Sequence, residues 1–158
     1  MAAVDYFLKI DGIQGESKAD KHKDEIDIES FSWGETQSGT FAVGGGGGSG
    51  KISMQDFHFT MPLNKASPAL FLACAQGAHI KNAILTCRKA GLEEFMKVTM
   101  SDVLVSSFQI GGAEGVVPTD QISRNFAKIE VEYEEQDATG KLVGSIKKWF
   151  DFKTMKGG

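Results

Sequence analysis

The first part of the chain alternates between apolar and polar residues in the way typical of β-strands. Tyr6, Leu8 and Ile10 share one face of a segment that ends at Gly12. A second segment, residues 26–33, also alternates, but its apolar residues move from one face to the other partway along. This exchange predicts a strand with different environments along its length.

The middle of the chain predicts a bent strand followed by one short helix. Apolar residues alternate over 52–61, with a change of parity at 55–56 that indicates a β-bulge or entry into another layer. Ser67 and Pro68 then have the chemistry of an N-cap and a first helical position, and Gly77 fits the left-handed position after a helix. We therefore expect a helix from Pro68 to Gln76.

The rest of the chain predicts further strands. Residues 83–88 and 95–100 read as a hairpin that turns at 90–91, and two loops are expected at the glycine-rich segment 111–118 and the charged segment 15–25. The other alternating segments are 103–108, 125–133 and 143–152. The pattern as a whole indicates a single mainly β domain over residues 1–158 with one short helix.

Length and charge narrow the classes of function. The chain has 158 residues, of which 24% are charged, and a formal net charge of −4. A domain of this length buries roughly 69% of its unfolded surface without disulfides or metals. The negative charge argues against a nucleic-acid partner held by phosphate neutralisation. We expect no membrane span and no signal peptide, because neither an apolar run of sufficient length nor a basic leader is present.

The segment 35–51 is polar and rich in glycine, and part of it resembles a phosphate-binding loop. Gly45, Gly50 and Lys51 match the spacing G-x-x-x-x-G-K. However, Ile52 occupies the position of the magnesium-binding hydroxyl, and strands rather than a helix are expected on both sides. A nucleotide-binding enzyme remains an alternative, but a long loop that orders on assembly with other subunits accounts better for the composition.

Other candidates for catalysis or metal binding have simpler explanations. The three histidines (His22, His58, His79) are far apart and lack metal-binding spacing, and His58 is expected on the face opposite its apolar neighbours. The two cysteines (Cys74, Cys87) are expected to be buried thiols with raised pKa. Glutamates at 130, 132 and 134 form the polar face of one strand. We therefore predict no enzyme activity and no cofactor, and several two-faced strands favour self-assembly.

Several motifs, in order along the chain, closely resemble the haemolysin-coregulated protein (Hcp) family. They are Phe31-Ser32-Trp33-Gly34, the tract from Gly44 to Lys51, Ser53 to Phe57, Arg88 to Gly91, Val103 to Ser107 and Asn125 to Ile129. The resemblance implies a compact β-barrel of two packed antiparallel sheets, with a lateral helix and a long Gly-rich loop. It also implies a type VI secretion system subunit whose hexameric rings stack into an inner tube.

The family resemblance also implies partners and a location. These are further copies of the chain, a contractile sheath and baseplate, a spike protein at the tube tip, and small effector proteins carried in the lumen. The protein would be cytoplasmic in the producing bacterium and then secreted without a signal peptide. A secreted cargo-binding chaperone ring that forms no extended tube is the alternative within this class.

Two groups of residues are predicted to carry this function. Ser32 is the candidate for lumen and cargo contact, because it lies between two aromatic residues and points away from both. The candidate assembly loop contains the glycines Gly44, Gly45, Gly46, Gly47, Gly48 and Gly50. Arg124 departs from the family pattern, which favours an apolar residue there, and is expected to affect local packing or a subunit contact.

Overall fold

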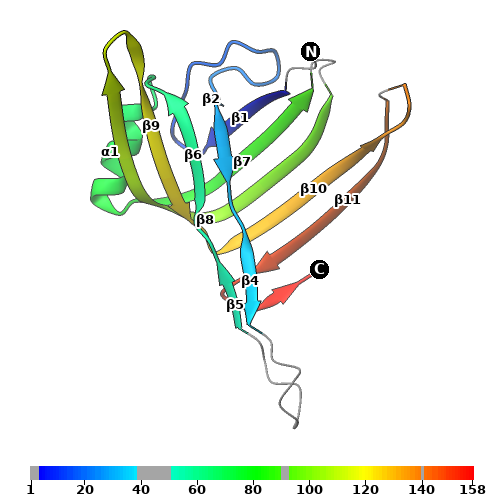
Figure 1. The fold of residues 1–158 in the computed structure, drawn as a ribbon. Helices are drawn as coiled ribbons and strands as arrows, with labels where there is room; N and C mark the ends of the chain where they lie inside the picture. Colours follow the sequence, from blue (N-terminus) through cyan, green and yellow to red (C-terminus); the bar gives the residue numbers. More distant parts are fainter. Residues whose placement is uncertain (1–3, 39–50, 90–92, 140) are drawn as a thin grey trace.

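The computed structural model describes residues 4–38, 51–89, 93–139 and 141–158, and shows strands with one helix against their side (Figure 1). The elements in chain order are β1 (Val4–Ile10), β2 (Ile26–Ile28), β3 (Ser30–Ser32), β4 (Glu35–Ser38), β5 (Lys51–Met54), β6 (Phe57–Pro62), α1 (Ser67–Gln76), β7 (His79–Lys89), β8 (Glu94–Ala113), β9 (Val116–Asn125), β10 (Lys128–Gln136), β11 (Leu142–Asp151) and β12 (Lys156–Gly157). The predicted mainly β fold with one lateral helix is confirmed.

Strand pairing follows a circuit around one core. From β1 it passes through β7, β8, β9 and β6 to β3, always antiparallel. Glu29 alone separates β3 from β2, which pairs with β1. In residues 26–33 the apolar side chains therefore move to the other face where the pairing partner changes, from β1 for β2 to β6 for β3. Strands β10 to β12 extend from β8 as a separate arm of the sheet (Figure 1).

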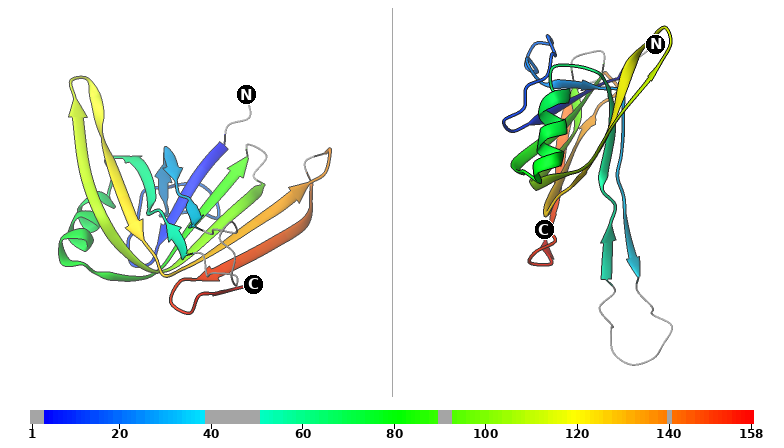
Figure 2. Two further views of the ribbon diagram at one scale, coloured as in Figure 1. Left: turned by 60° about the horizontal axis from the view of Figure 1, so that its bottom comes forward. Right: turned by 90° about the vertical axis from the view of Figure 1, so that its left-hand side faces the viewer.

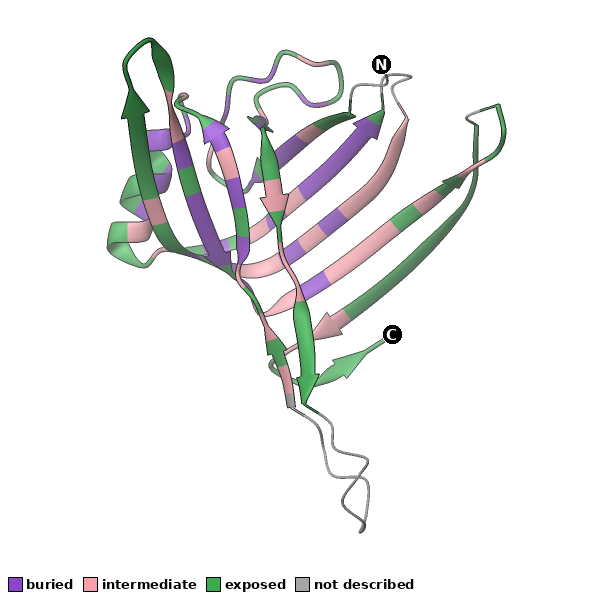
Figure 3. Cartoon of the chain, in the orientation of Figure 1, coloured by how far each residue is buried: buried purple, intermediate pink, exposed green. Residues whose placement is uncertain are grey.

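The core lies inside this circuit and is filled by the apolar positions of the alternating segments. Phe57 and Phe59 of β6 are almost fully buried, as are Leu85 of β7 and Val98 and Met100 of β8. The change of parity at Gln55 and Asp56 separates β5 from β6, so the predicted entry into another layer is also correct. Figure 3 shows how buried and exposed residues alternate along these strands.

Helix α1 begins differently from the prediction. Ala66 is the N-cap, without a side-chain capping bond, and Ser67 is the first helical residue. The Ser67 hydroxyl instead donates a hydrogen bond to the buried carboxylate of Asp120 in β9. The end of the helix is as predicted, because Gly77 takes a left-handed conformation with φ of 59°.

Three further boundaries were wrong in the sequence prediction. Strand β8 is continuous over 20 residues and joins the segments expected at 95–100 and 103–108, with a bend at Asp102, where φ is 54°. The expected loop at 111–118 is instead the end of a hairpin, because β9 begins at Val116. Asn125 ends β9 rather than starting the next strand.

The charged segment 15–25 crosses the outer face of β1 as a strap, defined here as residues 15–25. Its two arms hydrogen bond through backbone groups, with Gly15 N–H donating to the Asp24 carbonyl and Ser17 N–H to that of Glu25. The prediction of an exposed loop is only partly correct, because Ser17 and His22 are buried.

Replacing Gly15 with alanine is expected to destabilise the strap and the protein. A Cβ at this position would lie 2.5 Å from the carbonyl oxygen of Glu25, a backbone atom that cannot move aside cheaply. We expect Gly15→Ala to lower the free energy of unfolding by roughly 1–3 kcal/mol in urea denaturation. Gly144→Ala is the control, because a Cβ there meets no atom within 4 Å. Equal stability of both variants would contradict the close approach.

Candidate functional site

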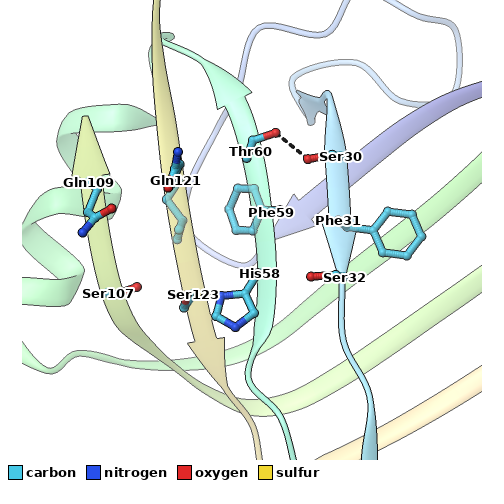
Figure 4. A pocket seen from close by; sticks show the side chains of 11 residues that line it. Ser30, Phe31, Ser32, His58, Phe59, Thr60, Ser107, Gln109, Gln121 and Ser123 are labelled. Carbon is cyan, nitrogen blue, oxygen red and sulfur yellow. Dashed lines mark hydrogen bonds between the residues drawn. The ribbon is translucent and has the colours of Figure 1, made fainter. Parts of the chain in front are cut away.

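Four neighbouring strands present a polar hollow on the face opposite the core (Figure 4). It has a volume of about 480 Å³, and the apolar residues Phe31, Phe59 and Ile122 contribute to its lining. The polar side chains around it are Ser30 and Ser32 of β3, His58 and Thr60 of β6, Ser107 and Gln109 of β8, and Gln121 and Ser123 of β9. This face carries hydroxyl and amide groups with a single imidazole.

Strand alternation accounts for the hollow. Phe31 lies between Ser30 and Ser32 and points to the other side of β3 (Figure 4). There its ring packs edge-on against Tyr6 and is stacked on Phe57 at 5.9 Å between centroids. Because successive side chains of a strand point to opposite faces, each buried aromatic places a polar neighbour in the hollow. The prediction that His58 lies opposite its apolar neighbours is therefore confirmed.

Hydrogen bonds link the polar side chains across the strands. The hydroxyls of Ser30 and Thr60 are 2.6 Å apart, and the Ser123 hydroxyl hydrogen bonds with Nδ1 of His58. Ser32 is exposed, lines the hollow and lies opposite His58 in the β3–β6 pairing. Hydroxyl, amide and imidazole side chains can bind the surface of another protein through hydrogen bonds.

The candidate assembly glycines from Gly44 to Gly50 lie outside the described residues. The elements on either side of them are β4 and β5, which pair as a two-stranded ribbon with Glu35 opposite Met54. This ribbon extends away from the rest of the sheet (Figure 2). The match to a phosphate-binding loop lacks the helix that its mechanism requires, since Lys51 to Met54 form β5.

The prediction of two buried thiols holds for only one cysteine. Cys87 is buried, and that burial raises the pKa of its thiol to about 11, whereas Cys74 on α1 is only half-buried, contrary to the prediction. Within the described ranges, no group of three or more His, Cys, Asp or Glu side chains could hold a metal ion. In that same part of the chain, no helix is long and apolar enough to cross a membrane.

Two exposed apolar surfaces lie on opposite sides of the chain, and the sequence prediction did not locate them. The β10–β11 face, defined as Val131, Tyr133 and Ile146, continues the core side of the sheet beyond the core. Tyr133 is 51% exposed and lies opposite Ile146, which is 63% exposed. Strand β11 is exposed along most of its length (Figure 3).

The second surface is the helix flank, defined as Phe71, Leu72 and Ile110. Phe71 and Leu72 on α1 are 59% and 50% exposed, and Ile110 of β8 is 56% exposed. The helix and the β10–β11 arm lie at opposite sides of the sheet (Figure 1). Exposed apolar surfaces of this kind are typical of protein contacts, so the β10–β11 face and the helix flank are two candidate contact surfaces.

Comparison with known proteins identifies the family. Residues 7–133 match the family model described as type VI secretion system effector, Hcp. The chain is 44% identical to Protein hcp1 of Pseudomonas aeruginosa over an alignment of 151 residues, with 93% of each chain covered. It therefore belongs to the Hcp family of type VI secretion system proteins.

Solved structures agree with this assignment. Hcp1 from Salmonella typhimurium has a TM-score of 0.83 and 36% sequence identity, with both chains covered completely. A structure described as a type six secretion system protein has a TM-score of 0.92 and 31% identity, and covers 99% of this chain and 100% of its own. The resemblance stated from sequence motifs is confirmed.

Proposed function

We propose that this chain is a structural subunit of the type VI secretion inner tube, and that six copies close into a ring. The observation that carries the proposal is the pair of unlike apolar surfaces on opposite sides of one chain. A head-to-tail contact between the β10–β11 face of one copy and the helix flank of the next uses both surfaces and closes into a ring when repeated. The 158 residues act as one domain in this assembly.

The polar hollow supports a lumen facing the axis of the ring. The four strands around it, β3, β6, β9 and the end of β8, lie side by side in the sheet. A ring that places the two apolar surfaces in contacts leaves this hydrogen-bonding face for water and cargo. We propose that small effector proteins bind there, that a contractile sheath and baseplate expel the stacked rings, and that a spike protein caps the tube.

Light scattering after size-exclusion chromatography tests the ring. We expect a mass about six times that of the chain, and negative-stain microscopy should show rings and stacks of rings. A mass of one or two chains at all concentrations would contradict the proposal. Rings that never stack, even when concentrated, would favour the chaperone-like ring over a tube.

Ser32→Gln is expected to reduce cargo retention without changing the fold. Ser32 is exposed in the hollow, so a longer side chain occupies cargo space without overfilling the core. We expect loss of co-purification with candidate effectors co-expressed in the producing bacterium, at an unchanged melting temperature and ring mass. Thr36→Gln, an exposed hydroxyl on β4, is the control. Loss of the ring together with the cargo would contradict the lumen position of Ser32.

The glycine segment is proposed to join successive rings. The β4–β5 ribbon that leads into it projects from the body of the chain (Figure 2), where it can reach a neighbouring ring. Deleting Gly44 to Gly48 is expected to preserve the melting temperature and the ring, and to abolish tubes in negative-stain images. Tubes of normal length after the deletion would show that the segment is only a spacer.

A further inference from the structure

The strap, residues 15–25, covers an aromatic side chain outside the main core. Phe7 is on the outer face of β1, yet it is only 2% exposed. The imidazole of His22 lies flat against it, with ring centroids 4.5 Å apart and planes within 4°. Residues from the strap thus shield an apolar surface that would otherwise face solvent.

His22 is held between two carboxylates. Its Nδ1 lies 2.8 Å from Oε2 of Glu25, within the strap, and its Nε2 lies 2.6 Å from Oε1 of Glu94, at the start of β8. The side chain of His22 is 7% exposed and that of Glu25 is 12% exposed, so water has little access to that contact, whereas Glu94 is 31% exposed. The bond to Glu94 ties the strap to a strand distant in sequence.

Only one protonation state of His22 satisfies both contacts. An imidazolium donates from both ring nitrogens, whereas a neutral imidazole has one N–H and one lone pair. In the neutral ring, a lone pair would face an ionised carboxylate at hydrogen-bond distance. Both contacts are therefore hydrogen bonds donated by the ring only when it carries two N–H groups.

Other charged groups lie around this pair. Arg88 of β7 lies on Phe7, with its Cζ 4.6 Å from the ring centroid, and Asp5 of β1 approaches that arginine at 3.5 Å. Asp27 of β2, whose pKa is raised by burial and by Asp5, accepts a hydrogen bond from Ser17 of the strap. Beside Glu94 lie Lys97 of β8 and Glu132 and Glu134 of β10. The carboxylates outnumber the cations in this set.

We propose that His22 is a protonation-dependent latch for the strap. The imidazolium holds the strap across β1 through Glu25 and Glu94, and loss of its proton releases the Glu94 contact and uncovers Phe7. The strap also forms walls of two open hollows lined by both lysines and carboxylates, among them Lys23, Lys65 and Asp24. Release of the latch would therefore remodel this charged end of the molecule. The latch lies within one chain and does not depend on ring formation.

Hydrogen exchange across a pH series tests the latch, with the titration of His22 followed on its Cε1–H resonance. After correction for intrinsic exchange, amides of the strap are expected to exchange about ten-fold faster as His22 loses its proton, the factor expected for one lost charged hydrogen bond. The midpoint should coincide with that of the resonance. Strap protection that is constant through the titration would overturn the proposal.

Three variants separate the latch from a general effect of pH. His22→Phe keeps a ring against Phe7 and should remove the pH response of the strap, as should Glu94→Gln, whose amide can pair with either form of the ring. His79→Gln is the control, because His79 is exposed and contacts Asp102 at 2.8 Å rather than a carboxylate of the strap or Glu94. A pH response that persists in Glu94→Gln would overturn the proposal even if His22→Phe failed to fold.

Discussion

Replacing Arg124 with methionine is expected to raise the free energy of unfolding by roughly 1–4 kcal/mol. Arg124 is 0% exposed, and within the described part of the chain none of its three guanidinium nitrogens has a hydrogen-bond partner. Its Cζ lies 4.6 Å from the Phe57 ring and 5.2 Å from the Phe59 ring, so cation–π contacts offset only part of the desolvation. Methionine fills a similar volume without a charge.

The gain from Arg124→Met should depend on pH. Burial lowers the pKa of Arg124 to about 9. Between this pKa and the higher pKa of an arginine in the unfolded chain, the unfolded chain binds more protons than the folded chain, so this residue makes stability rise with pH. The difference between variant and wild type in urea denaturation should therefore be largest below pH 9 and shrink above it. A difference that is independent of pH would contradict burial of the charged guanidinium.

Arg88→Met is the matched control for this experiment. Arg88 also lies against a phenylalanine, but it pairs with Asp5 and lowers the pKa of Asp27. Its removal leaves these carboxylates without a cation, so we expect this variant to be less stable than wild type. A higher free energy of unfolding for Arg124→Met and a lower one for Arg88→Met would distinguish the loss of an unpaired charge from the loss of a paired charge.

Ile146→Asn is expected to convert the ring into single chains. Ile146 is exposed on the β10–β11 face, and an amide there would be buried without a partner against the next copy. Light scattering should give the mass of one chain, while circular dichroism and the melting temperature of the isolated chain stay close to those of dilute wild type. Leu72→Asn on the helix flank should have the same effect.

Ser145→Asn provides the matched control on the same strand. Ser145 is exposed and its side chain is on the other face of β11, where it hydrogen bonds with Glu132. The same new residue at this neighbouring position should leave the ring intact. If both variants dissociate, the loss reflects a weakened strand rather than the apolar contact, and the proposed interface would be wrong.

Alternation predicted those strands whose inward positions are apolar. The exchange of faces near Glu29 and the break at Gln55 were both visible in the sequence and correct. Strand β9 was missed because its buried positions include Asp120 and Arg124, which carry charge where the pattern requires apolar residues. A hydrophobic period cannot reveal a strand whose inward side is charged.

The candidate site was predictable only in part, for similar reasons. Ser32 was identified from its aromatic neighbours, because alternation fixes which face a side chain takes. Its partners in the hollow come from β8 and β9 and depend on strand pairing that the local sequence does not specify. The burial of His22 likewise requires Glu94, 72 residues away in the chain. Ser67 lies one position after the N-cap, where its hydroxyl accepts a hydrogen bond from the Asn64 N–H and donates one to Asp120, a residue distant in the sequence.

Strand β8 also has consequences for how the chain folds. Its first part pairs with β7 and β10, and its second part pairs with β9, so one backbone belongs to both halves of the sheet. The hairpin of β7 and β8 is local in sequence and can form early. The pairing of β1 with β7, in contrast, joins two segments that are far apart in the sequence. Unfolding of either half exposes an edge of this shared strand. The two halves should therefore unfold in one cooperative transition, and hydrogen exchange should protect the amides of β8 longest.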